Sequence, residues 1–188
     1  HLPDITCISP IFLGGRLSFF VANRAHHSDV GGMTPGSMPL ATELFQEGLI
    51  IPPLKLYSRG QLNKDVFELI LANVRTPDER RGDLLAQVAA NEIGRSRLEE
   101  AVARFGAGQV RLYSGLIQDY SEKFLRQTLR GIPDGEYAFV DHLDDDGIST
   151  RPITIAVRIT IRGDKAIIDF SSSSPQTEGG VNANFAIT

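Results

Sequence analysis

A helical pattern bounded by prolines at both ends dominates the middle of this 188-residue sequence. It begins at Thr76-Pro77, where a capping residue precedes a proline in the first helical position, and it stops before Pro133. Apolar residues recur at helical spacing between these points, with an interruption at Gly106 and Gly108. The pattern predicts two long helices, joined by a glycine turn and packed as an antiparallel pair.

The sequence on either side of these helices has the alternating pattern of β-strands. Residues 5–22 are two β-rich runs around Gly14-Gly15, a dipeptide typical of two-residue hairpin turns. Residues 153–161 alternate apolar and exposed positions, a turn follows, and residues 166–170 return. The predicted fold class is therefore α+β, with an N-terminal β-hairpin, central long antiparallel helices and a C-terminal β-hairpin.

Shorter elements are expected around this frame. Residues 40–49 have helical spacing, and Asn63 is a capping residue in front of another apolar helical face. Asp141, His142 and the acidic residues 144–146 lack the glycine and the terminal glutamate of a calcium-binding loop. They are interpreted as a solvated turn before the C-terminal hairpin.

The domain organisation follows from this order of elements. Residues 1–135 are expected to form a hairpin with a metal site and a helical segment, and residues 136–188 a β-hairpin segment of the same domain. The chain starts at His1 without a methionine, and residues 185–188 contain no helix-ending signal. We therefore expect a fragment of a larger domain.

Composition excludes several classes of protein. The formal net charge of -4 leaves no basic surface able to neutralise a nucleic-acid backbone. No apolar run approaches the ~20 residues that span a bilayer. A single cysteine, Cys7, excludes an internal disulfide and suits a reducing compartment. A cytoplasmic protein without nucleic-acid or membrane partners is expected.

Three of the four histidines lie within the first 27 residues, each close to an aspartate. His1 and Asp4 form one group; His26, His27 and Asp29 form the other. Imidazole and carboxylate are ligands for Zn, Mn or Fe, and a hairpin over residues 5–22 would bring both groups to one end of the sheet. Either histidine of the second group can face the metal, depending on the local backbone. The alternative is that these side chains are solvated or merely orient one another.

A glycine-rich loop and one glutamate are further candidates for chemistry. Residues 31–37 can present backbone N–H groups to an anion or a developing oxyanion, or simply connect to the next helix. Glu43 follows this loop and is our candidate catalytic acid or base, the alternative being an ordinary surface glutamate.

Five segments of the sequence resemble the hydantoinase B family. They are HLPDIT, AHHSDVGGMTPGSMP, TELFQEGLIIPPLKLY, LILANVRTPDERRGDLLAQVAAN and DFSSSSPQTEGGVNAN. This family includes the C-terminal part of 5-oxoprolinase and is similar to the larger subunit of acetone carboxylase. The segments extend over almost the whole chain, in the order and spacing of the family.

The resemblance implies part of an ATP-dependent hydrolase that opens a cyclic amide such as a hydantoin or a lactam. A hydantoinase A type ATPase subunit or domain would bind ATP, giving a hetero-oligomer. Two alternatives remain open: a fragment of an ATP-dependent ketone carboxylase, and a non-catalytic scaffold that docks the ATPase component.

The resemblance also implies a divalent metal, held in the related carboxylases by an HxxD motif and a later histidine. The matching positions here are His1, Asp4 and His26, with Asp29 as an additional ligand or a support. The metal would polarise a carbonyl or activate water. The segment that precedes this motif in the family is missing from the chain.

Overall fold

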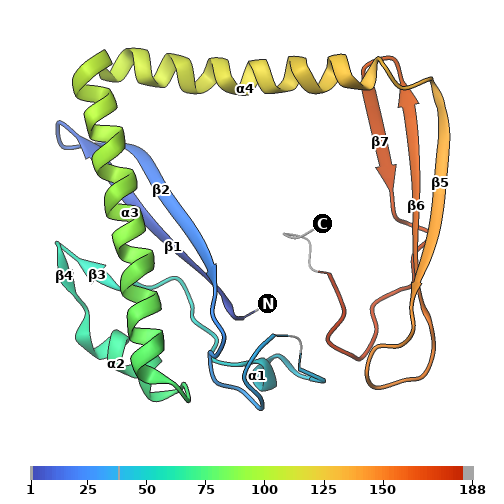
Figure 1. Ribbon diagram of the computed structural model, residues 1–188, viewed down its shortest axis with the longest axis horizontal. Helices are drawn as coiled ribbons and strands as arrows, with labels where there is room; N and C mark the ends of the chain where they lie inside the picture. The colour runs from blue at the N-terminus through green and yellow to red at the C-terminus, as the bar shows by residue number, and fades with distance from the viewer. Residues whose placement is uncertain (1, 38, 184–188) are drawn as a thin grey trace. The chain divides into compact units, whose positions relative to one another are not determined.

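The computed structural model describes residues 2–37 and 39–183 and contains helices and antiparallel hairpins, which confirms the predicted α+β class (Figure 1). It consists of two compact units, residues 1–100 and 101–188. The antiparallel pairing of the two long helices and the predicted boundary after residue 135 stay predictions. The two units are described separately below.

The first unit begins with a long antiparallel hairpin of β1 (Asp4–Leu13) and β2 (Arg16–His26). Gly14 and Gly15 form the turn with φ of 56° and 78°, the left-handed values that a type I′ turn requires and that glycine adopts without strain. The hairpin extends to residue 26, beyond the predicted end at residue 22. A register shift between Ile11 and Phe12 moves the pairing by one residue, so that Asp4 lies directly opposite His26.

The segment after the hairpin contains little regular structure. Its helix, α1, covers only Leu44–Glu47, although a helix over 40–49 was predicted, and Gly48 with φ of 146° ends it. Two short strands, β3 (Tyr57–Ser58) and β4 (Gln61–Leu62), follow as a small hairpin. Leu49, Ile51, Leu56 and Leu62 of this segment pack against the core that the following helices form.

Two helices complete the first unit, and both begin at the predicted caps. Asn63 accepts a hydrogen bond from the Val66 N–H at the start of α2 (Lys64–Ala72), and α3 (Pro77–Phe105) starts with its proline. The core of the unit lies between these helices, with further apolar residues from the preceding segment packed around it. Its buried members are Phe67, Ile70, Leu71 and Leu84.

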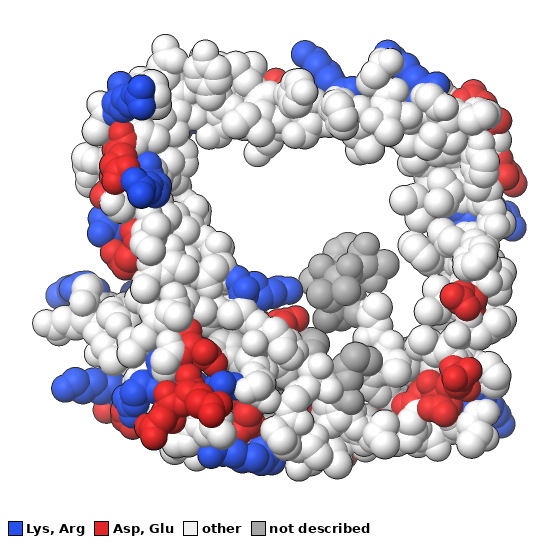
Figure 2. Space-filling view, viewed as in Figure 1, with Lys and Arg blue, Asp and Glu red and all other residues white. Residues whose placement is uncertain are grey.

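One face of α3 packs along the N-terminal hairpin through a row of buried polar residues. Gln87 and Asn91 are both buried and bond to residues of β1 and β2. The solvent side of α3 carries acidic and basic side chains in alternation, as Figure 2 shows along this helix, including the Arg95 ion pairs with Glu92 and Glu99. The polar buried face fixes the position of the helix on the hairpin, because each amide there needs a partner.

The second unit is α4 (Ala107–Leu129) with a three-stranded antiparallel sheet, β5-β6-β7. The strands are β5 (Gly135–Leu143), β6 (Ile153–Arg162) and β7 (Lys165–Asp169). The end of α4 is attached to the β6–β7 turn, where Asp164 pairs with Arg130 at 2.9 Å and with Arg126 at 3.5 Å. None of the described helices is long and apolar enough to cross a membrane.

Strand β5 corrects the expectation of a turn at Asp141 and His142. Both residues lie within β5, opposite Ile155 and Thr154 of β6. Every residue of β5 is exposed, and its sequence GEYAFVDHL contains a run of apolar residues instead of the alternation that revealed β6. The predicted C-terminal hairpin is therefore the second and third strand of a larger sheet.

Candidate functional site

The open end of the β1–β2 hairpin brings together two of the predicted metal ligands. Asp4 begins β1 and His26 ends β2, and the Oδ1 atom of Asp4 lies 3.1 Å from Nδ1 of His26. The side chains are 25% and 47% exposed, so the pair is accessible to solvent and to a ligand. The third predicted ligand, His1, lies outside the described residues.

Of the two adjacent histidines, His26 is exposed and His27 is buried. Its side chain is only 2% exposed, and its Nε2 lies 2.9 Å from Oε1 of Gln87. The Gln87 amide nitrogen donates to the Ile5 carbonyl, so the Gln87 amide oxygen faces His27 and accepts a hydrogen bond from it. His27 is therefore a buried Nε2–H donor, and His26 is the histidine on the side of Asp4.

Asp29 is 3% exposed and organises the loop after β2. Its carboxylate accepts hydrogen bonds from the Gly31 N–H at 3.0 Å, the Arg75 N–H at 2.5 Å and the Arg75 guanidinium at 2.9 Å. Burial alone raises the pKa of Asp29, but these hydrogen bonds and the charge of Arg75 outweigh it and lower the pKa. The group is thus an anion held by the protein itself.

The glycine-rich loop also uses its backbone groups internally. The N–H of Gly31 donates to Asp29, that of Met33 to the Gln46 carbonyl, and that of Gly36 to the Ser28 carbonyl. A Cβ on Gly31 would lie 2.5 Å from a backbone oxygen, so the loop needs glycine for close packing. These three N–H groups are engaged, which favours the connector reading of the loop over an oxyanion site.

Glu43, the candidate acid or base, is an exposed residue at the start of α1. Its backbone N–H donates to Oε1 of Gln46 at 3.3 Å, and Thr42 donates to the same oxygen at 2.8 Å. The position serves the beginning of a one-turn helix. A catalytic role for Glu43 stays a prediction.

The Asp4 carboxylate and the His26 imidazole at the open end of the hairpin fit a divalent metal. A carboxylate and an imidazole side by side are suitable ligands for Zn, Mn or Fe. Within residues 2–37 and 39–183, no cluster of three or more His, Cys, Asp or Glu side chains is arranged to hold a metal. The described residues therefore supply two adjacent donors, Asp4 and His26.

Sequence reasoning missed Gln87, which contacts both strands at this end of the hairpin. It occupies the same face of α3 as buried Leu84 and buried Asn91, at spacings of three and four residues. The available signal in the sequence was that the amides Gln87 and Asn91 continue the helical spacing of the apolar residue Leu84, which places them on the face that packs against the rest of the unit.

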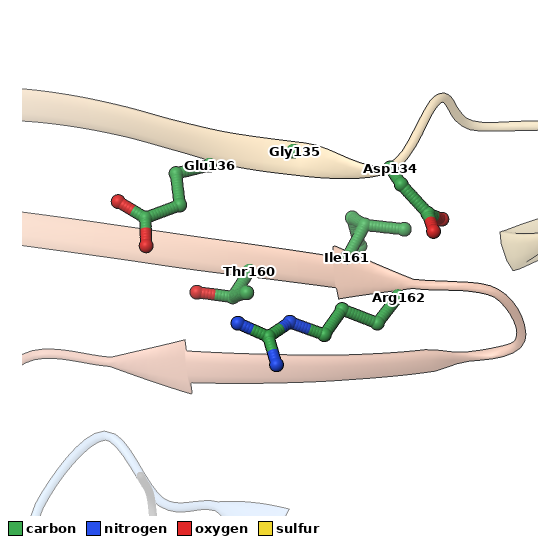
Figure 3. A pocket seen from close by; sticks show the side chains of 6 residues that line it. All are labelled: Asp134, Gly135, Glu136, Thr160, Ile161 and Arg162. Carbon is green, nitrogen blue, oxygen red and sulfur yellow. The ribbon is translucent and has the colours of Figure 1, made fainter.

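In the second unit, the hollow drawn in Figure 3 measures about 310 Å³ and lies at one end of the sheet. It is lined by Asp134, Gly135, Glu136, Thr160, Ile161 and Arg162. None of these residues is among the predicted site residues. Nothing in this hollow therefore connects it to the predicted chemistry.

Asp146, expected in a solvated turn, is instead 4% exposed and belongs to the same unit as that hollow. Its carboxylate accepts from the N–H groups of Ser149 at 2.6 Å, Ile148 at 3.0 Å and Gly179 at 3.2 Å. These bonds lower its pKa to about 2. The residue links two loops of the second unit, which is a structural role.

Comparison with known proteins agrees with the quoted sequence motifs. The family model described as Hydantoinase B/oxoprolinase matches residues 1–188. Caprolactamase subunit beta from Pseudomonas jessenii is 36% identical over 97% of this chain and 32% of its own length. 5-oxoprolinase 1 from Arabidopsis thaliana is 34% identical over all of this chain and 17% of its own length.

Solved structures agree with these relatives. The crystal structure of the ATP-dependent caprolactamase from Pseudomonas jessenii superposes with a TM-score of 0.89 at 35% identity, over 97% of this chain and 32% of that chain. Nucleotide-free acetone carboxylase superposes with a TM-score of 0.85 at 25% identity, over 93% of this chain and 25% of that chain. The chain thus spans about a third or less of the length of these proteins.

Proposed function

Because the chain belongs to the hydantoinase B/oxoprolinase family, we propose that it forms part of an ATP-dependent enzyme that hydrolyses a cyclic amide. The match over the entire chain is the observation that carries this proposal. Relatives named caprolactamase, hydantoinase and 5-oxoprolinase favour a lactam or hydantoin ring as the substrate. A hydantoinase A type ATPase subunit or domain is the proposed partner, which makes the assembly a hetero-oligomer with ATP bound by that partner.

We further propose that Asp4 and His26 hold a divalent Zn, Mn or Fe ion together with His1. The 3.1 Å approach of the Asp4 and His26 side chains at the solvent-accessible end of the hairpin supports this assignment. A bound metal would supply Lewis-acid polarisation of a carbonyl or activation of a water molecule. Asp29, whose carboxylate is already held by Arg75 and Gly31, is proposed as a support of the loop.

The proposed roles of the protein groups are binding and proton transfer. The Asp4 carboxylate and Nδ1 of the His26 ring face each other at 3.1 Å, so these two groups would donate to the same ion. Glu43 is the candidate proton donor or acceptor, and it is exposed to solvent. A reducing cytoplasm suits the single free cysteine, Cys7.

Metal content tests the site directly. Plasma mass spectrometry on the purified protein is expected to find close to one Zn, Mn or Fe per chain, lost in both Asp4→Ala and His26→Ala. His142→Ala is the control, because this exposed histidine lies on β5 of the second unit. Metal-free wild-type protein, with intact binding of the ATPase partner, would favour a non-catalytic scaffold instead.

The substrate class is tested with the ATPase partner added. Hydantoins, 5-oxoproline and larger lactams are expected to stimulate ATP hydrolysis and to yield ring-opened products. Similarity to acetone carboxylase favours a second candidate, an ATP-dependent ketone carboxylase. Stimulation by acetone with bicarbonate, and by none of the cyclic amides, would select that alternative.

A further inference from the structure

Gln87 is a buried amide on α3 that contacts the hairpin beside both proposed metal ligands. We propose that Gln87 is a positioning residue, which sets the distance and orientation of Asp4 and His26 for metal binding. The proposal rests on the proposed function of that pair. It adds a role for a residue that is neither charged nor a metal ligand.

Three hydrogen bonds of Gln87 reach both strands at the open end of the hairpin. Its Nε2 donates to the Ile5 carbonyl and to Oδ1 of Asn23, each at 2.9 Å, and its Oε1 accepts from His27 Nε2 at 2.9 Å. Ile5 directly follows Asp4, and His27 directly follows His26. One side chain therefore bonds to the residue next to each ligand, to the backbone of Ile5 and to the ring of His27.

Each of the three residues that follow His26 is held by a contact with another part of the first unit. The His27 N–H donates to the Pro3 carbonyl at 2.9 Å, which ties the start of this loop to the residue before Asp4. Ser28 accepts from the Arg80 guanidinium, and Asp29 pairs with Arg75 at 2.9 Å. These contacts restrict the backbone that follows His26, and the Arg80 contact together with Gln87 ties it to α3.

An amide is the only ordinary side chain of this length that satisfies all three partners. It provides two donors for two oxygens and one acceptor for an imidazole N–H. A glutamate at this position would bring a carboxylate against the Ile5 and Asn23 oxygens, which it cannot serve as a donor. Because the side chain is only 5% exposed, water does not replace the lost bonds.

Asn91 offers a matched control one helical turn further along α3. It is 2% exposed, donates to the Cys7 carbonyl at 3.2 Å and to Ser9 Oγ at 3.1 Å, and accepts from Asn23 at 2.8 Å. Asn91→Asp thus makes the same change from a buried amide to an acid, but away from the ends of the strands. A purely structural role for Gln87 would make the two variants equivalent.

The test is a Co²⁺ titration of the full chain, followed by the visible absorption of the bound ion, with thermal unfolding measured in parallel. Gln87→Glu is expected to weaken Co²⁺ binding by about 10- to 100-fold and to alter the absorption spectrum, as changes to residues that orient ligands do. Asn91→Asp is expected to lower the unfolding temperature comparably, with Co²⁺ affinity within about twofold of wild type. Gln87→Met, uncharged and of similar length, replaces Gln87→Glu if that variant does not fold.

The possible failures are distinguishable. Wild-type affinity and spectrum in folded Gln87 variants would overturn the positioning role alone, provided that Asp4→Ala and His26→Ala abolish binding. Equal loss of affinity in the Gln87 and Asn91 variants would also overturn it, since stability would then explain both. A wild-type protein that binds no Co²⁺, or binds it unchanged after Asp4→Ala and His26→Ala, would overturn the proposed metal site as well.

Discussion

Asp146 gives the second unit a stability that depends on pH. Hydrogen bonds from the Ser149 and Ile148 N–H groups lower its pKa from 3.8 to about 2, against an opposing effect of burial. A lowered pKa in the folded state stabilises the protein at pH values above the unfolded pKa of about 4. This contribution is lost as the pH falls from about 4 toward about 2.

Asp146→Asn is therefore expected to unfold at a lower temperature than wild type at pH 6, with a gap that narrows as the pH approaches 2.5. Asparagine keeps one acceptor oxygen but carries no charge to be protonated, so its own stability varies less with pH. Circular dichroism melts between pH 6 and pH 2.5 measure this gap. Asp145→Asn is the control, because Asp145 is adjacent to Asp146 in the sequence but is exposed. A gap that stayed constant with pH would contradict the argument.

The residues of the candidate site differ in how far sequence reasoning reached them. A turn at Gly14-Gly15 places the two strand ends together, which the sequence predicts, but a register shift between Ile11 and Phe12 is what sets His26 rather than Ala25 opposite Asp4. The orientation of His27 depends instead on Gln87, which is 60 residues away. Such a contact is set by helix packing, and no local pattern in the sequence encodes it.

At the level of elements, α3 carries a packing constraint that its sequence conceals. Gly94 faces β2 so closely that a Cβ would lie 2.7 Å from a methyl carbon of Val21, whereas Gly82 in the same helix has open space around it. Replacing a helical glycine by alanine usually stabilises by roughly 0.5–1 kcal/mol. Gly82→Ala is expected to gain this amount, and Gly94→Ala to lower the free energy of unfolding.

Chemical denaturation of the two alanine variants compares them directly. The valine at position 21 has little freedom to move aside, because β-branched side chains are restricted at χ1. Adding Val21→Ala to Gly94→Ala should therefore recover part of the lost stability. Stabilisation by both single variants would mean that α3 does not press on the hairpin at Gly94.

The ends of the helices could be predicted from the sequence and the exposed strand β5 could not. Helix ends depend on neighbouring residues, whereas this strand depends on pairing with a distant one. A cap such as Asn63 and a proline in the first helical position such as Pro77 act within one turn, so both can be recognised from neighbouring residues. Strand β5 is exposed along its whole length and is identified by pairing with β6. The helix predicted over residues 40–49 is only four residues long because Glu43 before it is extended and Gly48 after it adopts a non-helical φ.

At the level of the whole molecule, this chain leaves much apolar surface uncovered on α4. None of the described residues of this helix is buried. Large apolar side chains recur on it at helical spacing, and each is at least 45% exposed: Leu112, Tyr113, Leu116, Ile117, Tyr120 and Phe124. A contiguous apolar face of this kind favours association in water.

We expect the 188-residue chain to self-associate at high concentration, and the double variant Ile117→Lys with Phe124→Lys to do so at least about 100-fold more weakly. Each large apolar side chain removed from water contributes about 1.5–3 kcal/mol, and a buried lysine charge adds a penalty. Multi-angle light scattering over a concentration series measures the effect. Gln118→Lys, also on α4, adds a charge without removing apolar surface and should associate like wild type. Since neither Ile117 nor Phe124 belongs to the buried core, all variants should keep the wild-type unfolding temperature. If the double variant and Gln118→Lys associated equally strongly, the surface responsible for association would lie elsewhere on the chain.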